Sequence, residues 1–336
     1  MNEFSFATVR SYEQAATLLK DKRFSLPMLK GGGMDIVDHL KEGLAEPDLL
    51  INVRRVREGG VDPIAMSTSS GKPVVRIAAS ATMAEIARSP ILLEHAPVVA
   101  NAVGKAATPQ VRNAATAAGN LLQRPRCWYY RQSEFDCLKK GGSRCFAAEG
   151  ENKYHAIFGD GPCHIVHPSN LAPALHVCDG VAHLTNSTRD SIAIADLFHM
   201  PDRGIRDEHN LKPGEIITHI TLTPRPRSGF YVVKEKQSFD WPLVFACVAI
   251  ESESGSTRIS SARVCAGAVA PTPWPMPEVE AALVGVDAKD DAALTKALSS
   301  CTRGAKPMAQ NAYKLDLLPV VLARATRLAA GLPALA

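Results

Sequence analysis

The spacing of apolar residues divides the chain into a mixed first part, an irregular middle and a C-terminal part in which strands precede helices. In the first two parts, short apolar runs predict strands at residues 25–29, 48–52, 73–79 and 216–222. The C-terminal pattern predicts strands at 230–234, 243–250 and 259–269 and helices at 277–284, 290–301 and 308–330. Strands followed by helices are typical of an α+β domain. A turn-rich stretch at 224–229 marks its start.

Two helix starts in the first part carry capping residues. Ser11 precedes an apolar helical pattern, and Thr82 stands three residues before Glu85, as in a capping box. An alanine-rich segment at 97–122 follows, interrupted by glycine and proline. These elements predict a small α/β unit at 1–60 and a second unit at 61–223.

Length and charge limit the classes of function. A chain of 336 residues has room for two or three domains. Its formal charge of +4 and the lack of a basic, aromatic stripe argue against nucleic-acid binding. Arginines and prolines interrupt the apolar tail at 315–336, which predicts an amphipathic helix and no membrane span. Residues 1–10 lack the apolar run of a secretory signal, so we expect a cytoplasmic protein, or a periplasmic one exported with a signal-bearing partner.

Two segments have the composition of a phosphate or cofactor contact. Three glycines at 31–33 stand between a strand and a helix, where main-chain N–H groups can approach a phosphate. They match neither the P-loop nor the dinucleotide fingerprint, so a plain tight turn is the alternative. The segments 108–113 and 116–121 place small residues around Thr and Asn, which suits a flat or anionic ligand or, equally, a capped core turn.

Four of the eight cysteines fall in one irregular insertion, at about residues 122–166: Cys127, Cys137, Cys145 and Cys163. No two of them form the closely spaced pair of a structural zinc site, which favours an iron–sulfur cluster with one thiolate at each iron. Lysines and arginines in the insertion would offset the negative charge of such a cluster. A zinc ion held by all four thiolates and a pair of disulfides are the alternatives. The other four cysteines lie in apolar runs and are expected to be buried.

Together these motifs resemble the FAD-binding subunits of the xanthine dehydrogenase and aldehyde oxidoreductase family, which belong to molybdenum hydroxylases. The matching segments, in family order, are KGGGMD at 30–35, VRN at 111–113, TAAGNL at 116–121, HPSNLAPAL at 167–175, KEKQSFDW at 234–241 and GAVAP at 267–271. The insertion, which ends in NKYHAI at 152–157, looks like that of the branch with a 4Fe–4S cluster, such as the flavoprotein subunit of periplasmic aldehyde oxidoreductase.

The resemblance implies a fold and a set of cofactor contacts. The fold is α+β: a vanillyl-alcohol-oxidase-type FAD-binding domain of two α/β subdomains, then a flavoprotein C-terminal domain at 224–336. The four insertion cysteines would bind the 4Fe–4S cluster. The implied FAD contacts are Leu29, Lys30, Gly31, Gly32, Gly33, Met34, Asp35 and Ile36 around the pyrophosphate, Thr108, Thr116, Gly119, Asn120 and Leu121 as a second wall, and His167, Asn170, Asp179 and Lys236. Asn170 departs from the aspartate that the family often has there and is a weaker contact.

The implied activity is electron transfer. A large subunit with the molybdenum cofactor would oxidise an aldehyde, and a small 2Fe–2S subunit would pass the electrons to FAD and on to an external acceptor. No residue of this chain is expected to act as a catalytic acid, base or nucleophile. Because the cysteines lie in an insertion apart from the FAD motifs, we expect their cluster to lie off the shortest electron route and to contribute mainly to stability or to buffering electrons. The alternatives are a purine dehydrogenase flavoprotein, a stand-alone flavin oxidoreductase and a non-enzymatic zinc scaffold.

Overall fold

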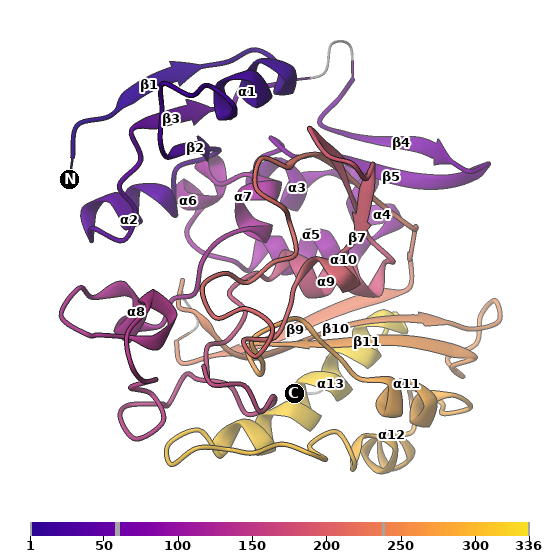
Figure 1. Ribbon diagram of the computed structural model, residues 1–336. Helices are drawn as coiled ribbons and strands as arrows, with labels where there is room; N and C mark the ends of the chain where they lie inside the picture. Colours follow the sequence, from indigo (N-terminus) through magenta and orange to yellow (C-terminus); the bar gives the residue numbers. More distant parts are fainter. Residues whose placement is uncertain (1, 58–60, 237–238, 335–336) are drawn as a thin grey trace.

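The computed structural model describes residues 2–57, 61–236 and 239–334, and begins with a small parallel sheet (Figure 1). The strand order is β1-β3-β2. The elements are β1 (Ser5–Thr8), α1 (Tyr12–Leu19), β2 (Pro27–Lys30), α2 (Ile36–Lys41) and β3 (Leu49–Asn52). Ser11 caps α1, as expected, by accepting a hydrogen bond from the Gln14 N–H. Since β2 ends at Lys30, the three glycines form the turn that leads into α2.

The second unit is a five-stranded antiparallel sheet covered by short helices. Its strand order is β4-β5-β8-β6-β7. The strands are β4 (Ile64–Ser69), β5 (Lys72–Ala78), β6 (Val181–Thr185), β7 (Ser191–Ala193) and β8 (Ile216–Leu222). The helices are α3 (Met83–Arg88), α4 (Pro90–His95), α5 (Pro97–Gly104), α6 (Pro109–Ala114), α7 (Ala117–Leu121), α9 (Leu171–Val177) and α10 (Ile194–Leu197). One face of this sheet is apolar and carries Val75, Ile77, Ile220 and Leu222. These residues are buried in the hydrophobic core that the first two units share, called the first core below.

The third unit is a four-stranded antiparallel sheet with helices on one side. It contains β9 (Ser228–Lys234), β10 (Pro242–Glu251), β11 (Ser261–Gly267), β12 (Trp274–Pro275), α11 (Pro277–Leu283), α12 (Asp291–Leu298) and α13 (Tyr313–Ala329). Alternate residues of β10 enter different cores: Val244, Ala246 and Val248 face the C-terminal core, whereas Phe245 and Cys247 join the first. The apolar run of β10 is therefore continuous because the strand is buried on both faces.

The cysteine insertion lies between α7 and α9 and is mostly irregular. Its short helices are α8 (Trp128–Arg131) and the 3₁₀ turn η1 (Leu138–Lys140). A buried polar contact joins it to α13: the Lys314 Nζ donates to the His155 carbonyl at 2.9 Å, and also to the carbonyl of Ala268, just after β11, at 2.6 Å. Among the described residues, no helix combines the length and apolar character needed to cross a membrane.

Candidate functional site

The three consecutive glycines lie where two main-chain segments touch. A Cβ on Gly32 would be 2.7 Å from the carbonyl carbon of Ala114, closer than a side chain can approach backbone. A Cβ on Gly31 would be 2.7 Å from the Oγ1 of Thr116. Gly33 has a φ of +85°, which glycine adopts without the strain other residues incur. The turn therefore needs glycine both for its own conformation and for its contact with the neighbouring segment.

That neighbouring segment consists of two short helices with threonine caps. At the start of α6, the side chain of Thr108 accepts a hydrogen bond of 3.2 Å from the N–H three residues later. At the start of α7, Thr116 accepts one of 3.3 Å from the Gly119 N–H. Ser169, just before α9, donates to the Asn120 side chain at 2.6 Å. These contacts hold a second wall of small residues opposite the glycine turn.

The glycine turn and the threonine-capped segment border one cavity of about 770 Å³. This volume is in the range of pockets for organic ligands, about 300–1,000 Å³. The predicted residues that line it are Leu29, Gly31, Gly32, Gly33, Met34, Asp35, Ile36, Thr108, Thr116, Gly119, Asn120 and Asn170. The fold thus brings together two walls that are about 80 residues apart in the sequence.

Three other predicted contacts lie outside this lining. The Nζ of Lys30 donates to the Gly31 carbonyl at 3.2 Å, and Leu121 is buried in the first core. Lys236 is exposed, and its backbone N–H donates to the Asp240 carboxylate at 3.1 Å. Residues 237–238 of the KEKQSFDW segment lie outside the described residues.

Asp179 is not at the cavity either. Its carboxylate pairs with Arg225 at 2.8 Å and with Arg263 at 3.1 Å. The two arginines lie far along the chain, so no local sequence pattern could indicate these ion pairs. In the structure, Asp179 joins the second unit to β11 and to the segment before β9, and its contact with FAD stays a prediction.

His167 lines a second cavity, of about 290 Å³, that adjoins the first. Asn170 and Trp241 line both cavities, and Trp128 lines only the second. Burial lowers the pKa of His167 to about 3, so its ring is neutral. Its Nε2 is buried without a hydrogen-bond partner among the described residues, which leaves a polar atom in this aromatic cavity for a ligand to satisfy.

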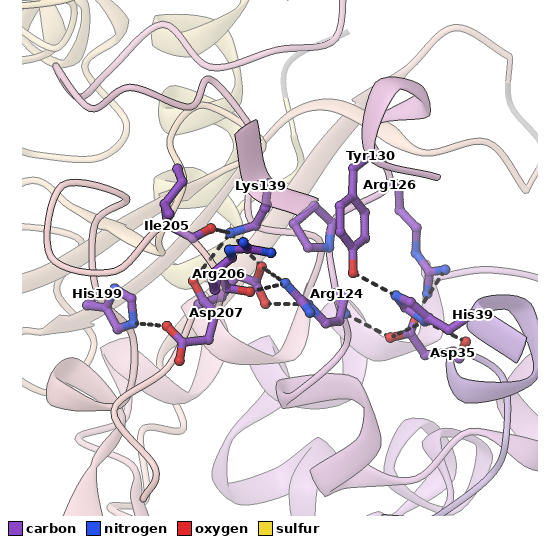
Figure 2. Close-up of polar contacts among 12 residues, drawn as sticks. Asp35, His39, Arg124, Arg126, Tyr130, Lys139, His199, Ile205, Arg206 and Asp207 are labelled. Carbon is purple, nitrogen blue, oxygen red and sulfur yellow. Dashed lines mark hydrogen bonds and ion pairs between the residues drawn. The ribbon is translucent and has the colours of Figure 1, made fainter. Parts of the chain in front are cut away.

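The sequence predicts arginines of the insertion as counter-charges for a cluster and gives no sign that they act at the first cavity. Arg126 and Arg131 form ion pairs with Asp35, which lines that cavity, at 3.0 and 2.8 Å (Asp35 and Arg126 in Figure 2). Burial alone would raise the pKa of Asp35, but the two guanidinium groups outweigh it and lower that pKa. Arg126 also lies over the Trp241 ring, 5.2 Å from its centre, and lines both cavities.

The four insertion cysteines lie in one neighbourhood as free thiols. Cys145 and Cys163 share a hydrogen bond, which lowers the pKa of Cys145 to about 5 and raises that of Cys163. Burial raises the pKa of Cys127 to about 11, with smaller contributions from Cys137 and Cys145. Nearby main-chain N–H groups favour three of the thiolates by lowering the pKa: those of Tyr129 and Tyr130 for Cys127, of Ala147 and His164 for Cys145, and of Ile165 for Cys163.

A histidine adjoins these thiols. The Nε2 of His155 lies 3.3 Å from the Cys127 sulfur, and its Nδ1 is buried without a partner among the described residues. Burial lowers the pKa of His155 to about 4. Within residues 2–57, 61–236 and 239–334, no three His, Cys, Asp or Glu side chains converge on a position for a single metal ion.

Two protein families match this chain, one over the first two units and one over the third. The family described as "FAD binding domain in molybdopterin dehydrogenase" matches residues 2–226, and "CO dehydrogenase flavoprotein C-terminal domain" matches residues 229–329. The chain is an FAD-binding member of the molybdopterin dehydrogenase family. It is 32% identical over 331 residues to the aldehyde oxidoreductase FAD-binding subunit PaoB of Escherichia coli (strain K12), covering 96% of this chain and 97% of that protein.

Two solved structures of oxidoreductases share the fold. Quinoline 2-oxidoreductase from Pseudomonas putida 86 superimposes with a TM-score of 0.72 at 17% identity, covering 98% of both chains. A Cu,Mo-CO dehydrogenase superimposes with a TM-score of 0.70 at 22% identity, also over 98% of both. The family resemblance and the fold class expected from the sequence are thereby confirmed.

The geometry fits the FAD that this molybdenum hydroxylase subunit binds. A diphosphate needs closely approaching N–H donors, and the glycines at 31–33 line the first cavity without side chains that could cover their main chain. A planar ring system suits aromatic walls, which Trp128 and Trp241 provide in the second cavity. The chain is thus the FAD-binding subunit of a molybdenum hydroxylase, and its two adjoining cavities contain chemical groups that suit the diphosphate and the flavin ring.

Proposed function

We propose that this chain is the electron-transfer subunit of an aldehyde-oxidising molybdenum hydroxylase. It would assemble with a large subunit that carries the molybdenum cofactor and a small 2Fe–2S subunit, and it would hold FAD and a 4Fe–4S cluster. The likeness to an aldehyde oxidoreductase subunit over nearly the whole chain supports the substrate class. The observation that carries the proposal is the group of four buried or half-buried thiols, of which Cys127 lines the second cavity.

FAD would exchange electrons singly with iron–sulfur clusters and in pairs with an external acceptor. The residues of this chain bind and orient it. Main-chain N–H groups of Gly31, Gly32 and Gly33 would contact the diphosphate, with the Thr116 segment behind them. Arg126 and Trp241 lie between the two cavities and would set the position of the flavin ring. No side chain has to exchange a proton with the substrate, because substrate oxidation belongs to the molybdenum subunit.

The thiol group has the features expected of cluster ligands. Main-chain N–H groups near the sulfurs of Cys127, Cys145 and Cys163 favour thiolate charge and would raise the reduction potential of a bound cluster. Lys139 adds a buried positive charge that favours the Cys163 thiolate.

Cofactor analysis of the purified full-length chain tests the cluster. We expect FAD together with about four iron and four sulfide per chain, as a Cys₄-ligated 4Fe–4S cluster requires. Cys137→Ala should lose iron and sulfide, whereas Cys301→Ala, a buried cysteine outside the insertion, should retain them. Wild-type protein that contains zinc without sulfide would contradict the proposal and favour the zinc scaffold.

Purification of the complex through a tag on this chain tests the assembly. We expect molybdenum and two further subunits to copurify, and an aldehyde to bleach the flavin absorbance in the complex but not in the isolated chain. A purine that bleaches it while aldehydes do not would move the assignment to the purine dehydrogenase alternative. Turnover by the isolated chain would favour a stand-alone flavin oxidoreductase.

A further inference from the structure

The helix that follows the first insertion cysteine begins at the cysteine itself. Cys127 is the N-cap of α8, and its carbonyl accepts hydrogen bonds from the N–H groups of Tyr130, at 3.1 Å, and Arg131, at 3.0 Å. The helix has only one turn and cannot be stable alone. Its position therefore depends on what holds Cys127 and on what its side chains contact.

Those side chains reach directly to the glycine turn. The Tyr130 hydroxyl is 3.0 Å from the His39 Nε2, and the His39 Nδ1 is 2.9 Å from the backbone oxygen of Asp35 (Figure 2). Arg131 pairs with Asp35 at 2.8 Å and with Asp38 at 2.6 Å. Asp35 stands two residues after the last glycine and is the N-cap of α2. Two consecutive residues of α8 thus fix the element that presents the main-chain donors to FAD.

These contacts are buried, so breaking them would leave polar groups without partners. Tyr130 is 3% exposed and His39 is 4% exposed. The backbone N–H of Arg124 also donates to Asp35, at 2.9 Å, and the Arg124 side chain pairs with Glu208 at 2.9 Å. A displaced α8 would therefore disturb Asp35 through several bonds together, because unpaired buried polar groups are strongly disfavoured.

The second insertion cysteine is anchored on the opposite side. Lys139, two residues after Cys137, pairs with Glu208 at 2.7 Å and donates to the Ile205 carbonyl at 2.9 Å. Its side chain is 1% exposed. Since Arg124 and Lys139 share Glu208, the segments next to Cys127 and Cys137 are tied to one carboxylate (Arg124 and Lys139 in Figure 2). Ligation of both cysteines would hold this whole arrangement in place.

We propose that Tyr130 and Arg131 couple the cysteine site to FAD, so that loss of the cluster weakens flavin binding. They act as positioning residues: neither lines the first cavity, and both work through Asp35 and His39, which do. The inference rests on the proposed function, since it requires a cluster. By linkage, bound FAD must stabilise the cluster by the same factor. A chain that lost its cluster to oxidation would then release its flavin as well.

The test compares FAD affinity before and after cluster removal in the full-length chain. Iron is removed with EDTA and ferricyanide, and the dissociation constant of added FAD is measured from flavin fluorescence. We expect cluster loss to raise the dissociation constant at least about fivefold, the lower end of typical coupling between sites. This comparison uses wild-type protein, so its result does not depend on whether a variant folds.

Two matched variants identify the route. Tyr130→Phe deletes the hydroxyl that contacts His39, whereas Tyr129→Phe deletes a neighbouring hydroxyl whose partner, the Glu151 N–H at 2.7 Å, lies within the insertion. Tyr130→Phe should weaken FAD binding with the cluster present and reduce the effect of its removal, and Tyr129→Phe should match wild type in both. Equal responses of the two variants would overturn the assigned route.

Iron analysis separates failure of this inference from failure of the proposed function. If the chain contains iron and sulfide but binds FAD equally well after their removal, the coupling is wrong and the cluster assignment stands. If the purified chain contains neither, the cluster assignment and the coupling fail together.

Discussion

Replacing Gly32 by alanine is the sharpest test of the flavin cavity. The new Cβ would lie 2.7 Å from the carbonyl carbon of Ala114 and closer still to its oxygen. Both partners are backbone atoms, so no side chain can rotate away. The glycine turn must then move from the threonine-capped segment, and the donors that bind the diphosphate move with it.

Strain of this kind costs about 1–3 kcal/mol. If the unliganded turn relaxes and FAD binding has to restore the strained position, the dissociation constant of FAD rises about 5- to 140-fold, at 1.4 kcal/mol for each factor of ten. Flavin fluorescence measures the constant, and far-UV circular dichroism verifies that the fold is retained. Gly104→Ala is the control, because its Cβ would meet only the Ala87 Cβ at an ordinary 3.8 Å.

The reasoning would be refuted if Gly32→Ala bound FAD as tightly as wild type and the Gly104→Ala control did so too. That result would mean that the contact between the glycine turn and the segment at 114–116 does not set the geometry of the diphosphate site. If both variants bound FAD more weakly than wild type, the site would instead be sensitive to alanine substitution in general, and the effect would be unrelated to this contact.

Three further perturbations test other parts of the structure. Thr116→Val removes the cap of α7 and should cost about 1 kcal/mol of stability, with weaker FAD binding that Thr116→Ser restores; an unchanged FAD affinity would contradict the role of this wall. Lys314→Met leaves buried carbonyls unpaired and should lower the free energy of unfolding by about 1–3 kcal/mol, measured by denaturant unfolding, whereas the exposed Lys296→Met should have no effect. His167 has a pKa lowered by burial to about 3, so below pH 6.5 the unfolded chain binds more protons than the folded one. Stability should fall as the pH drops from about 6.5 toward 3, by up to about 1.4 kcal/mol per unit from this residue, and His167→Leu should flatten the dependence; an identical pH profile would contradict a buried neutral ring.

The secondary structure of the C-terminal domain could be predicted because its buried residues are the apolar ones, which recur along the sequence at the spacing of strands and helices. The expected strand at 243–250 is contained in β10 (Pro242–Glu251), and the helix expected at 277–284 is α11 (Pro277–Leu283). The last helix begins at Tyr313, five residues later than the start predicted at 308, because residues 308–312 form a turn in which Asn311 accepts a hydrogen bond from the Met308 N–H. The small strands β1 and β4 escaped prediction, since their exposed residues show no apolar pattern.

The candidate site could be predicted only where its contacts are local in sequence. The glycine turn and the capped segment carry their geometry in their own residue types, and both line the cavity. The partners of Arg126 and Asp179 could not be predicted, because a charged residue in an irregular segment gives no sign of which distant charge it meets. Arg126 looked like a counter-ion for thiolates and instead pairs with Asp35, 91 residues earlier in the chain.

The C-terminal domain contributes residues to both cavities of the flavin site. The two faces of β10 belong to different cores, so removal of this strand would expose the side of the first core that Phe245 and Cys247 cover. The residues just before β10, Asp240 and Trp241, line both cavities. Because β10 is packed on both faces, it also holds the preceding Trp241 in place, and the ring of Trp241 lies under the Arg126 guanidinium of the insertion. Flavin binding, the insertion and the C-terminal core are connected through one strand, which is why a perturbation in any of the three should be detectable in FAD affinity.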